Sequence, residues 1–471
     1  MARSINVRAT ARKKVPIAVR TYQSALNFLK GMTNYEEMTR VGYNSINFNL
    51  SRMNRLVAAL GNPHKKLRFI HIAGTKGKGS TATMLASMLG QCTLKVGLYT
   101  SPHLLDIRER IQINGEMISE ADMTRLMARI APVVKKLAKD EPTFFEIMTA
   151  AAFLHFADQQ VDFAVIETGL GGRLDSTNII RPDLCAITSI SYDHVNQLGS
   201  TLEKIAEEKA GIIKPGIPVV CSPQSKEVRK VLLKAAEKVK APIYFTGKDI
   251  EFSYRFESSR PIGPHTRVSL TTANTRFEHL PVPMLGDHQA INCGLALSVI
   301  ALLKERGLEI SDQSVIDGLA RVRMPGRMEI IQETPRILVD GAHNAASVEA
   351  LMRAIGQNIP YDSMIVIFGC QSDKDIPGML RHVQLGADKA IFTVTGSPRS
   401  ADPHDLAAEY MEASGKMAQV AERLEDALDI AERAVTREDI ICIAGSFYLV
   451  GLAKRVVAER YARKNEVVLA G

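Results

Sequence analysis

A glycine-rich loop that contains a lysine is the clearest chemical feature of this sequence. The loop, Gly74–Ser80, follows the apolar run Leu67–Ala73, which predicts a strand, and leads into the helical pattern Ser80–Leu89. Glycines let backbone N–H groups turn toward phosphate oxygens, a helix N-terminus adds the positive end of its dipole, and Lys78 adds a full charge. A glycine turn alone could be structural. The strand, lysine and helix together predict phosphate binding, although an extra glycine separates the lysine from the serine of the strict P-loop pattern.

Three further strand ends carry side chains suited to a hard cation. These side chains are Ser101 after the run Val96–Thr100, Glu167 at the end of Phe163–Glu167, and His194 after Leu184–Ile190. Because ligands of open α/β sheets bind at the carboxyl ends of the strands, we expect the three to lie together. Oxygen ligands suit Mg²⁺, so Glu167 is a candidate metal ligand. A solvated strand-end acid and a satisfied loop histidine are the structural alternatives.

The second half of the chain again places polar residues after a strand. Asp340 and His343 follow the apolar run Ile337–Asp340. Alone, they could belong to an N-cap for a helix that begins near Ala345. Paired with a phosphate loop in another domain, they predict the far wall of a cleft between domains. Lys209, in contrast, lies in a charged helical run (EEKAG), which is typical of a solvated helix face.

The elements that must position these groups alternate in type along the chain. Short apolar runs alternate with helical patterns, which indicates a mainly parallel sheet of an α/β fold, covered on both faces. Three later runs predict a small appended antiparallel sheet, namely Phe252–Phe256, Arg267–Thr271 and Arg276–Leu280. Pro325-Gly326 then interrupts the pattern, and a smaller Rossmann-like α/β pattern follows.

Length and charge suggest three segments. A chain of 471 residues exceeds one ordinary core, so more than one domain is expected. We expect a basic flexible extension over 1–20, a P-loop-type ATP-binding domain over 21–323 and a C-terminal α/β domain over 324–471. The extension contains no acidic residue, so a transit peptide or a nucleic-acid-binding arm is an open alternative.

Composition favours a cytoplasmic globular protein. The chain is 46% hydrophobic and 23% charged, and no apolar run is long enough for a membrane helix. Its six cysteines show no CxxC spacing, which fits reduced thiols better than a zinc site or a disulfide framework. Outside the extension the charges nearly balance, which suits an enzyme for small anions better than a duplex-binding surface. We therefore expect neither a nucleic acid nor a membrane as a partner.

Taken together, these motifs resemble the folylpolyglutamate synthase and dihydrofolate synthase family of the Mur ligase superfamily, in its bifunctional bacterial type. The matching stretches span nearly the whole chain and are Asn47–Leu50 with Arg52-Met53, His71–Thr75, Ser101–Leu104, Glu109–Ile111, Phe144–Glu146, Glu167–Asn178, Asp193-His194, Glu208–Ile212, His288-Gln289 with Asn292, Pro325–Arg327, Asp340–Asn344 and Gly445–Leu449. One departure concerns Lys76, where members of the family usually carry asparagine.

The resemblance implies roles for the matching residues. The ATP contacts would be Lys76, Gly77, Lys78, Gly79, Ser80, Asn292, Arg327 and Asp340, with His343 near the terminal phosphate. The metal ligands would be Ser101, Glu167, His194 and Lys209, the last as a carbamate. The pterin or folate contacts would be Phe145, Asp175 and, in a more loosely aligned segment, Asn47. The catalytic residues would be Lys78, Lys209 and His343. The carbamate role reverses the solvated-face interpretation of Lys209.

The resemblance also implies a reaction. An ATP-dependent ligase would convert the carboxylate of dihydropteroate, of a folate or of both into an acyl phosphate, which the amine of L-glutamate attacks. Two Mg²⁺ ions are the expected cofactors, a monovalent cation is an open addition, and a monomer is expected. The competing functions are a cell-wall Mur ligase and an ATP-regulated protein that binds nucleic acid through the basic extension.

Overall fold

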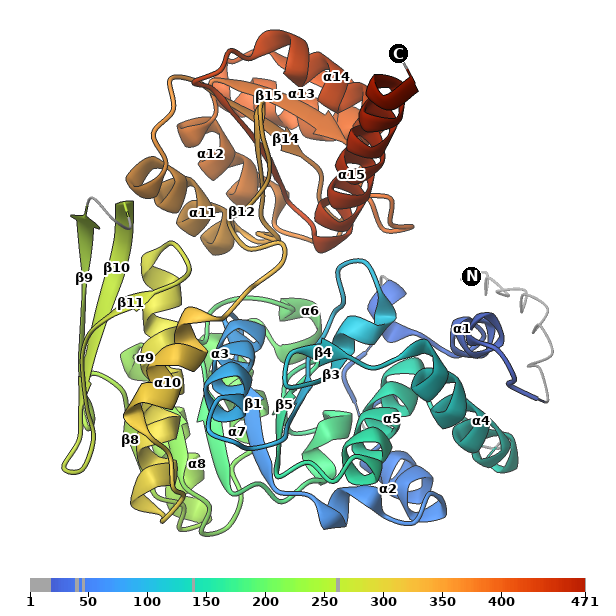
Figure 1. Ribbon diagram of the computed structural model, residues 1–471, viewed down its shortest axis with the longest axis vertical. Coiled ribbons are helices and arrows are strands. Elements are labelled where there is room, and N and C mark those ends of the chain that lie inside the picture. Colours follow the sequence, from blue (N-terminus) through green and yellow to red (C-terminus); the bar gives the residue numbers. More distant parts are fainter. Residues whose placement is uncertain (1–17, 39–41, 45–46, 138–139, 260–262, 471) are drawn as a thin grey trace, which may run out of the picture.

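Two α/β bodies lie one above the other in Figure 1, a computed structural model that describes residues 18–38, 42–44, 47–137, 140–259 and 263–470. One body is built on an eight-stranded sheet and the other on a six-stranded sheet, with a three-stranded sheet beside the first. Residues 1–17 lie outside the described part, so the basic extension over 1–20 stays a prediction. None of the described helices is long and apolar enough to cross a membrane.

The eight-stranded sheet has the strand order β4-β3-β2-β5-β1-β6-β7-β8. Its strands are β1 (Phe69–Ala73), β2 (Val96–Tyr99), β3 (Ile111–Ile113), β4 (Glu116–Met117), β5 (Phe163–Glu167), β6 (Leu184–Ile187), β7 (Val219–Cys221) and β8 (Ile243–Phe245). Only the pairs β2–β3 and β3–β4 are antiparallel. The strand β1, which carries the glycine loop, lies between β5 and β6.

Helices cover both faces of this sheet because side chains alternate along each strand. On β1, Ile70 and Ile72 belong to one core cluster and Phe69 to a second. Residues of α3 (Lys78–Gly90), α9 (Asp287–Glu305) and α10 (Asp312–Ala320) complete the first cluster. Residues of α1 (Tyr22–Lys30), α2 (Leu50–Ala59), α4 (Glu120–Lys136) and α5 (Phe144–Asp158) complete the second. A third cluster, around β6 and β7, includes α7 (Leu202–Ala210) and α8 (Lys226–Lys238).

The small sheet is antiparallel, as the sequence predicted. It has the order β11-β10-β9, with β9 (Glu251–Ser259), β10 (Gly263–Thr271) and β11 (Arg276–Val282). It stands at the edge of the lower body in Figure 1, and β10 contacts the long helix α9 that follows it. The sheet thereby flanks the helix whose first turn enters the cavity described below.

The second body has the strand order β12-β13-β17-β14-β15-β16, parallel except for β12. Its strands are β12 (Glu329–Glu333), β13 (Arg336–Val339), β14 (Met364–Phe368), β15 (Lys389–Thr393), β16 (Ala418–Ala421) and β17 (Ile440–Ala444). Its helices are α11 (Ala345–Asn358), α12 (Ile376–Gly386), α13 (Pro403–Ser414), α14 (Leu424–Ala434) and α15 (Phe447–Ala470). The boundary at residues 323 and 324 lies just before β12 and stays a prediction.

The predicted fold class is confirmed, whereas some element limits and elements were wrong or missing. The predicted strand Leu184–Ile190 ends at Ile187. The chain leaves the sheet there, because the Ser189 carbonyl accepts the backbone N–H groups of Thr75 and Lys76 at 3.1 and 3.3 Å. The loop after β6 is thus held by the glycine loop instead of by a neighbouring strand. The helices α1 and α4 were not anticipated.

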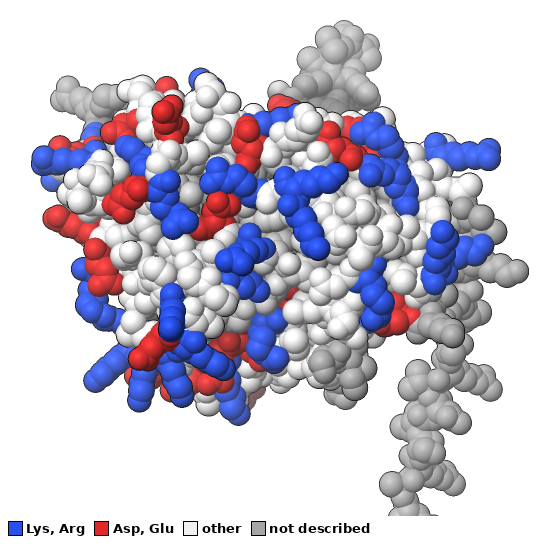
Figure 2. Space-filling view, turned by 90° about the horizontal axis from the view of Figure 1, so that it is seen from below, with Lys and Arg blue, Asp and Glu red and all other residues white. Residues whose placement is uncertain are grey.

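Charged side chains of both signs share the molecular surface. On the face that Figure 2 shows from below, acidic side chains lie among the basic ones. Several exposed cations are paired within the chain, for example Arg68 with Asp183 at 2.8 Å and Arg353 with Glu349 at 2.6 Å. Surface pairs of this kind contribute little to stability. Their acidic members do, however, prevent the basic side chains from forming a continuous region of positive electrostatic potential.

Candidate active site

A cavity of about 920 Å³ lies where the two bodies meet. The glycine loop, the ends of β2 and β5, the loop after β6 and the start of α9 line it from the first body. The start of α11 and the loop after β14 line it from the second. All the residues to which the sequence assigned a role border this one cavity. Their placement is therefore as expected, while their roles stay predictions.

The glycine loop has the backbone conformation that its glycines permit. Gly74 and Gly77 have φ values of +153° and +80°, which side chains disfavour, and α3 begins directly afterwards at Lys78. A Cβ atom on Gly77 would lie 2.0 Å from Oδ1 of Asn292, so the loop packs against the first turn of α9. The first N–H groups of α3 have no partner within the helix and can receive an anion.

Glu167 forms the floor of the cavity beside this loop. Its carboxylate is 4% exposed, lies 3.8 Å from Nζ of Lys78, and accepts the backbone N–H of Ser101 at 3.1 Å. Burial raises the pKa of Glu167, and the positive charge of Lys78 opposes that shift. The structure thus joins Ser101 to Glu167, because β2 and β5 are neighbouring strands.

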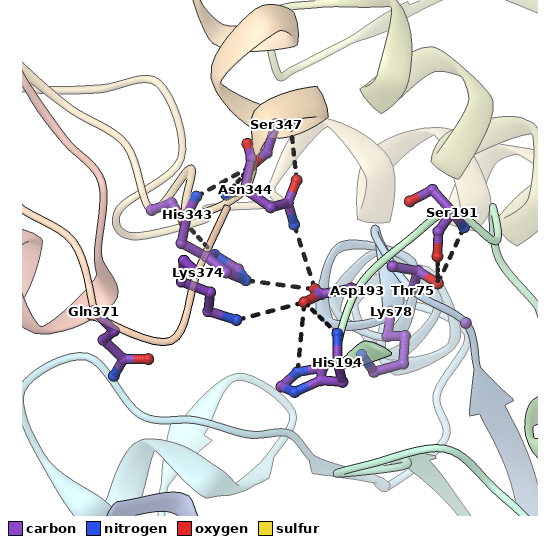
Figure 3. Close-up of polar contacts among 12 residues, drawn as sticks. Thr75, Lys78, Ser191, Asp193, His194, His343, Asn344, Ser347, Gln371 and Lys374 are labelled. Carbon is purple, nitrogen blue, oxygen red and sulfur yellow. Dashed lines mark hydrogen bonds and ion pairs between the residues drawn. The ribbon is translucent and has the colours of Figure 1, made fainter. Parts of the chain in front are cut away.

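His194 lies farther from the sheet than the sequence predicted. It precedes the short helix α6 (Val195–Leu198) in a left-handed conformation, with φ of 49°, and its side chain is 42% exposed. Its Nε2 lies 3.9 Å from the Asp193 carboxylate, a contact that Figure 3 draws as a dashed line. No three His, Cys, Asp or Glu side chains of the described residues form a metal-binding group. A magnesium site here would therefore combine Glu167 with other donors.

Lys209 is buried, so the solvated-face interpretation from the residues alone was wrong. The side chain lies on α7 one turn after Ile205, and both residues face the core. Its Nζ donates to the Gly74 carbonyl at 2.7 Å. Burial, assisted by the charge of Lys78, lowers the pKa of Lys209 from 10.5 to about 7. A substantial neutral fraction of this amine is thus present near neutral pH.

Asp193 connects the two bodies across the cavity. Lys374 lies 3.4 Å from its carboxylate, Asn344 donates to it at 3.3 Å, and Nε2 of His343 lies 4.0 Å away (Figure 3). Burial opposes ionisation, but the charges around Asp193 hold its pKa well below the usual range. Nδ1 of His343 contacts the Gly341 carbonyl at 2.8 Å, which fixes the ring.

Arg327 and Asp340 form a second charged group on the same side. The Arg327 guanidinium lies 4.4 Å from the centre of the Phe447 ring, and burial lowers its pKa. Asp340 accepts the backbone N–H groups of Met328 and Ala342 at 2.9 and 2.8 Å. Burial raises the pKa of Asp340, whereas Arg327 lowers it. The two backbone donors thus fix the orientation of the Asp340 carboxylate.

Phe145 and Asp175 also border the cavity. A Cβ on Gly169 would lie 2.5 Å from Cζ of Phe145, so only glycine lets this ring lie against the backbone. The Asp175 carboxylate is 3% exposed and accepts the Leu170 N–H at 2.9 Å. The side-chain amide of Asn47 donates to the Gly42 carbonyl at 2.8 Å, so this donor is already used within the chain.

Several residues of the cavity wall had no predicted role. Lys374 and Arg399 come from loops of the second body, and no motif in the surrounding sequence indicated that they border a site. Arg52 pairs with Glu146 at 2.7 Å, and both side chains are buried. Arg52 and Glu146 lie in two of the stretches that match the family. A search of those stretches for residues of opposite charge could therefore have suggested this ion pair. Ser45 and Ile46, the first two residues of the loosely aligned segment that ends at Asn47, lie outside the described residues.

Comparisons with known proteins agree with this geometry. Residues 72–300 match the family model of the Mur ligase middle domain, and residues 326–447 match that of the Mur ligase glutamate ligase domain. The chain is 40% identical to the dihydrofolate synthase/folylpolyglutamate synthase of Bacillus subtilis over 408 residues, which are 85% of this chain and 93% of that protein. The Escherichia coli protein of the same description is 30% identical, over 95% of this chain and 98% of its own length.

Solved structures have the same arrangement. The Mycobacterium tuberculosis folylpolyglutamate synthase complexed with ADP has a TM-score of 0.83 at 31% identity, over 92% of this chain and 98% of that one. Escherichia coli FolC in complex with DHPP and ADP has a TM-score of 0.81 at 30% identity, over 95% and 100%. The chain therefore belongs to the dihydrofolate synthase/folylpolyglutamate synthase family of Mur ligases and is an ATP-dependent acid–amino-acid ligase.

Proposed function

We propose that the cavity joins L-glutamate to the carboxylate of dihydropteroate, of a folate or of both. A carboxylate is a poor electrophile, so transfer of the ATP γ-phosphoryl group to it first gives an acyl phosphate. This first step also releases ADP. The glutamate amine then attacks the acyl carbon, so that the amide forms and phosphate leaves. The supporting observation is that one cavity joins the glycine loop, the buried Glu167 and the region of Phe145 and Asp175.

ATP is assigned to the glycine loop and the facing wall. The N–H groups of the loop Lys76–Ser80 and of the first turn of α3 receive the phosphates, and Lys78 neutralises charge that develops during transfer. Asn292, which packs against Gly77, is assigned to ATP as well. Arg327 and Asp340 complete the ATP contacts from the second body, because both border the cavity.

Magnesium is assigned to the edge formed by Ser101 and Glu167, with His194 and a modified Lys209 as further ligands. The buried carboxylate of Glu167 has Lys78 at 3.8 Å as a neighbouring charge, and oxygen donors are the ligands that this ion prefers. When bound there, the ion would neutralise negative charge on the phosphates. Two ions remain the expectation, and a monovalent cation remains open.

Lys209 is proposed to become a carbamate. A neutral amine adds to carbon dioxide, forming an N–C bond and releasing a proton, and the depressed pKa of Lys209 makes the neutral amine available. The product replaces the neutral amine with an anion that can help to hold a metal. Lys209→Ala is expected to lose activity and to regain part of it with formate or acetate. Full activity of this variant without added carboxylate would contradict the assignment.

The acceptor substrate is assigned to Phe145, Asp175 and Asn47. An aromatic ring stacks against a pterin, and a buried carboxylate accepts N–H groups of its heterocycle. Glutamate is assigned to the second body, where the cations Lys374 and Arg399 border the cavity and match its two carboxylates. His343 would then lie close to the terminal phosphate. Closure of the two bodies would exclude the water that hydrolyses acyl phosphates.

The division into domains 21–323 and 324–471, a monomeric state and a cytoplasmic location complete the proposal. The decisive assay measures ADP release with dihydropteroate and with tetrahydrofolate in parallel, each with and without L-glutamate. Release that requires both a pterin carboxylate and glutamate is expected. ADP release that does not depend on glutamate would refute the proposed reaction. Comparison of the two acceptors would separate dihydrofolate synthase activity from folylpolyglutamate synthase activity.

A further inference from the structure

A directed chain of hydrogen bonds connects the strand of the glycine loop to Asp175. Nε2 of His71, in the middle of β1, lies 2.8 Å from Oγ1 of Thr177, in the short helix η5 (Ser176–Ile179). The same hydroxyl donates to Oδ1 of Asp175 at 2.5 Å, and the Thr177 N–H donates to that oxygen at 2.9 Å. His71 and Thr177 are fully buried.

The direction of this chain follows from counting hydrogens. A threonine hydroxyl has one hydrogen, and here it points to the carboxylate, so Thr177 must accept from Nε2–H of His71. Nδ1 of His71 has no hydrogen-bond partner among the described residues, which fits the same tautomer. Burial lowers the pKa of His71 to about 3, so the ring is neutral at physiological pH. The imidazole therefore acts as a fixed donor.

Asp175 is held by donors on both of its oxygens. Oδ1 receives the two Thr177 donors, and Oδ2 receives the Leu170 N–H at 2.9 Å. Burial raises the pKa of Asp175, and the Thr177 hydroxyl is the foremost group that opposes this shift. The hydroxyl thus favours the ionised carboxylate and fixes its plane.

We propose that His71 is a positioning residue for the acceptor substrate, acting through Thr177 to hold the Asp175 carboxylate in the orientation that receives N–H donors of the heterocycle. This inference rests on the proposed function, in which Asp175 binds that substrate. Since His71 lies three residues before Gly74 on β1, the same strand positions the phosphate loop and the acid of the acceptor site. Misplacing this acid should weaken acceptor binding without disturbing the loop.

The test separates the KM values of the three substrates. Thr177→Val removes the hydroxyl at nearly equal volume and is expected to raise the KM for the pterin substrate about tenfold, the usual effect of losing one hydrogen bond to a charged group. The KM values for ATP and glutamate should change less than about twofold, which is the resolution of such a comparison. Thr177→Ser should recover most of the lost affinity. Thr393→Val, at another buried threonine far along the chain in β15, is the matched control.

A double-mutant cycle tests the contribution of His71. His71→Gln keeps an N–H donor near the position of Nε2, whereas His71→Leu removes it, so only the leucine variant should resemble Thr177→Val. In the Thr177→Val background, His71→Leu should add little, because the connection is already broken. If His71→Leu does not fold, the glutamine variant and the Thr177 pair still decide the outcome.

Three results would overturn the inference. The first is a Thr177→Val enzyme whose KM for the pterin substrate equals that of the wild type. The second is an equal rise in all three KM values together with a lower unfolding temperature, which indicates a structural role only. The third is full additivity of His71→Leu and Thr177→Val. A wild-type enzyme that uses no pterin carboxylate would refute the proposed function as well, so the two failures are distinguishable.

Discussion

Replacing Lys209 by methionine tests whether a neutral amine is buried next to the glycine loop. Lys209 is 4% exposed, and burial together with the charge of Lys78 lowers its pKa from 10.5 to about 7. One pKa unit corresponds to about 1.4 kcal/mol, so the charged form costs about 5 kcal/mol more in the folded protein than in water. Methionine has similar length and no charge, and it avoids this cost.

The sign of the pH dependence follows from proton uptake. The unfolded chain protonates Lys209 below pH 10.5, whereas the folded protein does so only below about pH 7. Between these values the unfolded state binds more protons, so this group makes the wild type more stable as pH rises. The penalty due to Lys209 is about 4 kcal/mol at pH 7 and about 2 kcal/mol at pH 9. The variant leaves the Gly74 carbonyl without its donor, a loss of about 1–3 kcal/mol at any pH.

The expected result is a stabilised but inactive variant. At pH 7 Lys209→Met should be more stable than the wild type by about 1–3 kcal/mol, and this advantage should fall by about 2 kcal/mol at pH 9. Urea unfolding in buffer free of carbon dioxide measures both, by tyrosine fluorescence, since the chain has 11 tyrosines and no tryptophan. Lys234→Met, on the exposed face of α8, is the control. A stability difference that does not change with pH would refute a buried neutral amine.

Three further variants test the site and its supports. Lys78→Ala should abolish glutamate-dependent ADP release without changing the unfolding midpoint, and unchanged turnover would exclude the loop as the phosphate site. Gly77→Ala should raise the KM for ATP at least about tenfold, because a side chain is strained at φ of +80° and its Cβ would lie 2.0 Å from Asn292; an unaltered KM would contradict this packing. Arg52→Leu should destabilise the fold by about 3–5 kcal/mol by leaving Glu146 buried and unpaired. Adding Glu146→Leu should restore most of that stability in urea unfolding, and equal losses in both variants would contradict the argument.

Features that repeat along the chain could be predicted from the sequence. The strand β5 has the predicted limits, and α3 begins two residues before and ends one residue after the predicted helix Ser80–Leu89. Apolar runs and glycines determine such elements locally, because periodicity and backbone freedom act over a few residues. The pairing of Ser101 with Glu167 also followed, since strand ends of a parallel sheet share one edge.

The positions of single polar groups were harder to predict. His194 was expected at a strand end but lies in a loop that leaves the sheet, because backbone contacts with Thr75 and Lys76 draw this loop toward the phosphate site. The sequence contains no local signal for such contacts. Asp193 belongs to a matching stretch but had no predicted role of its own. In the structure it pairs with Lys374, which is 181 residues away in the sequence. A pair of this kind exists only once the two sheets are placed relative to each other.

The sequence by itself predicted the phosphate loop, the α/β class and a group of residues that all border the cavity, although other wall residues such as Lys374 and Arg399 were not among them. Only the tertiary structure determined the burial, protonation and orientation of those residues. Lys209 belongs to a charged run, but the packing of α7 buries it one turn from Ile205 and makes its charge unfavourable. His71 reads as one residue of an apolar strand, yet its link to Thr177 and Asp175 depends on η5 packing beside β1. Protonation and orientation depend on neighbours distant in sequence, and these appear only when the chain is folded.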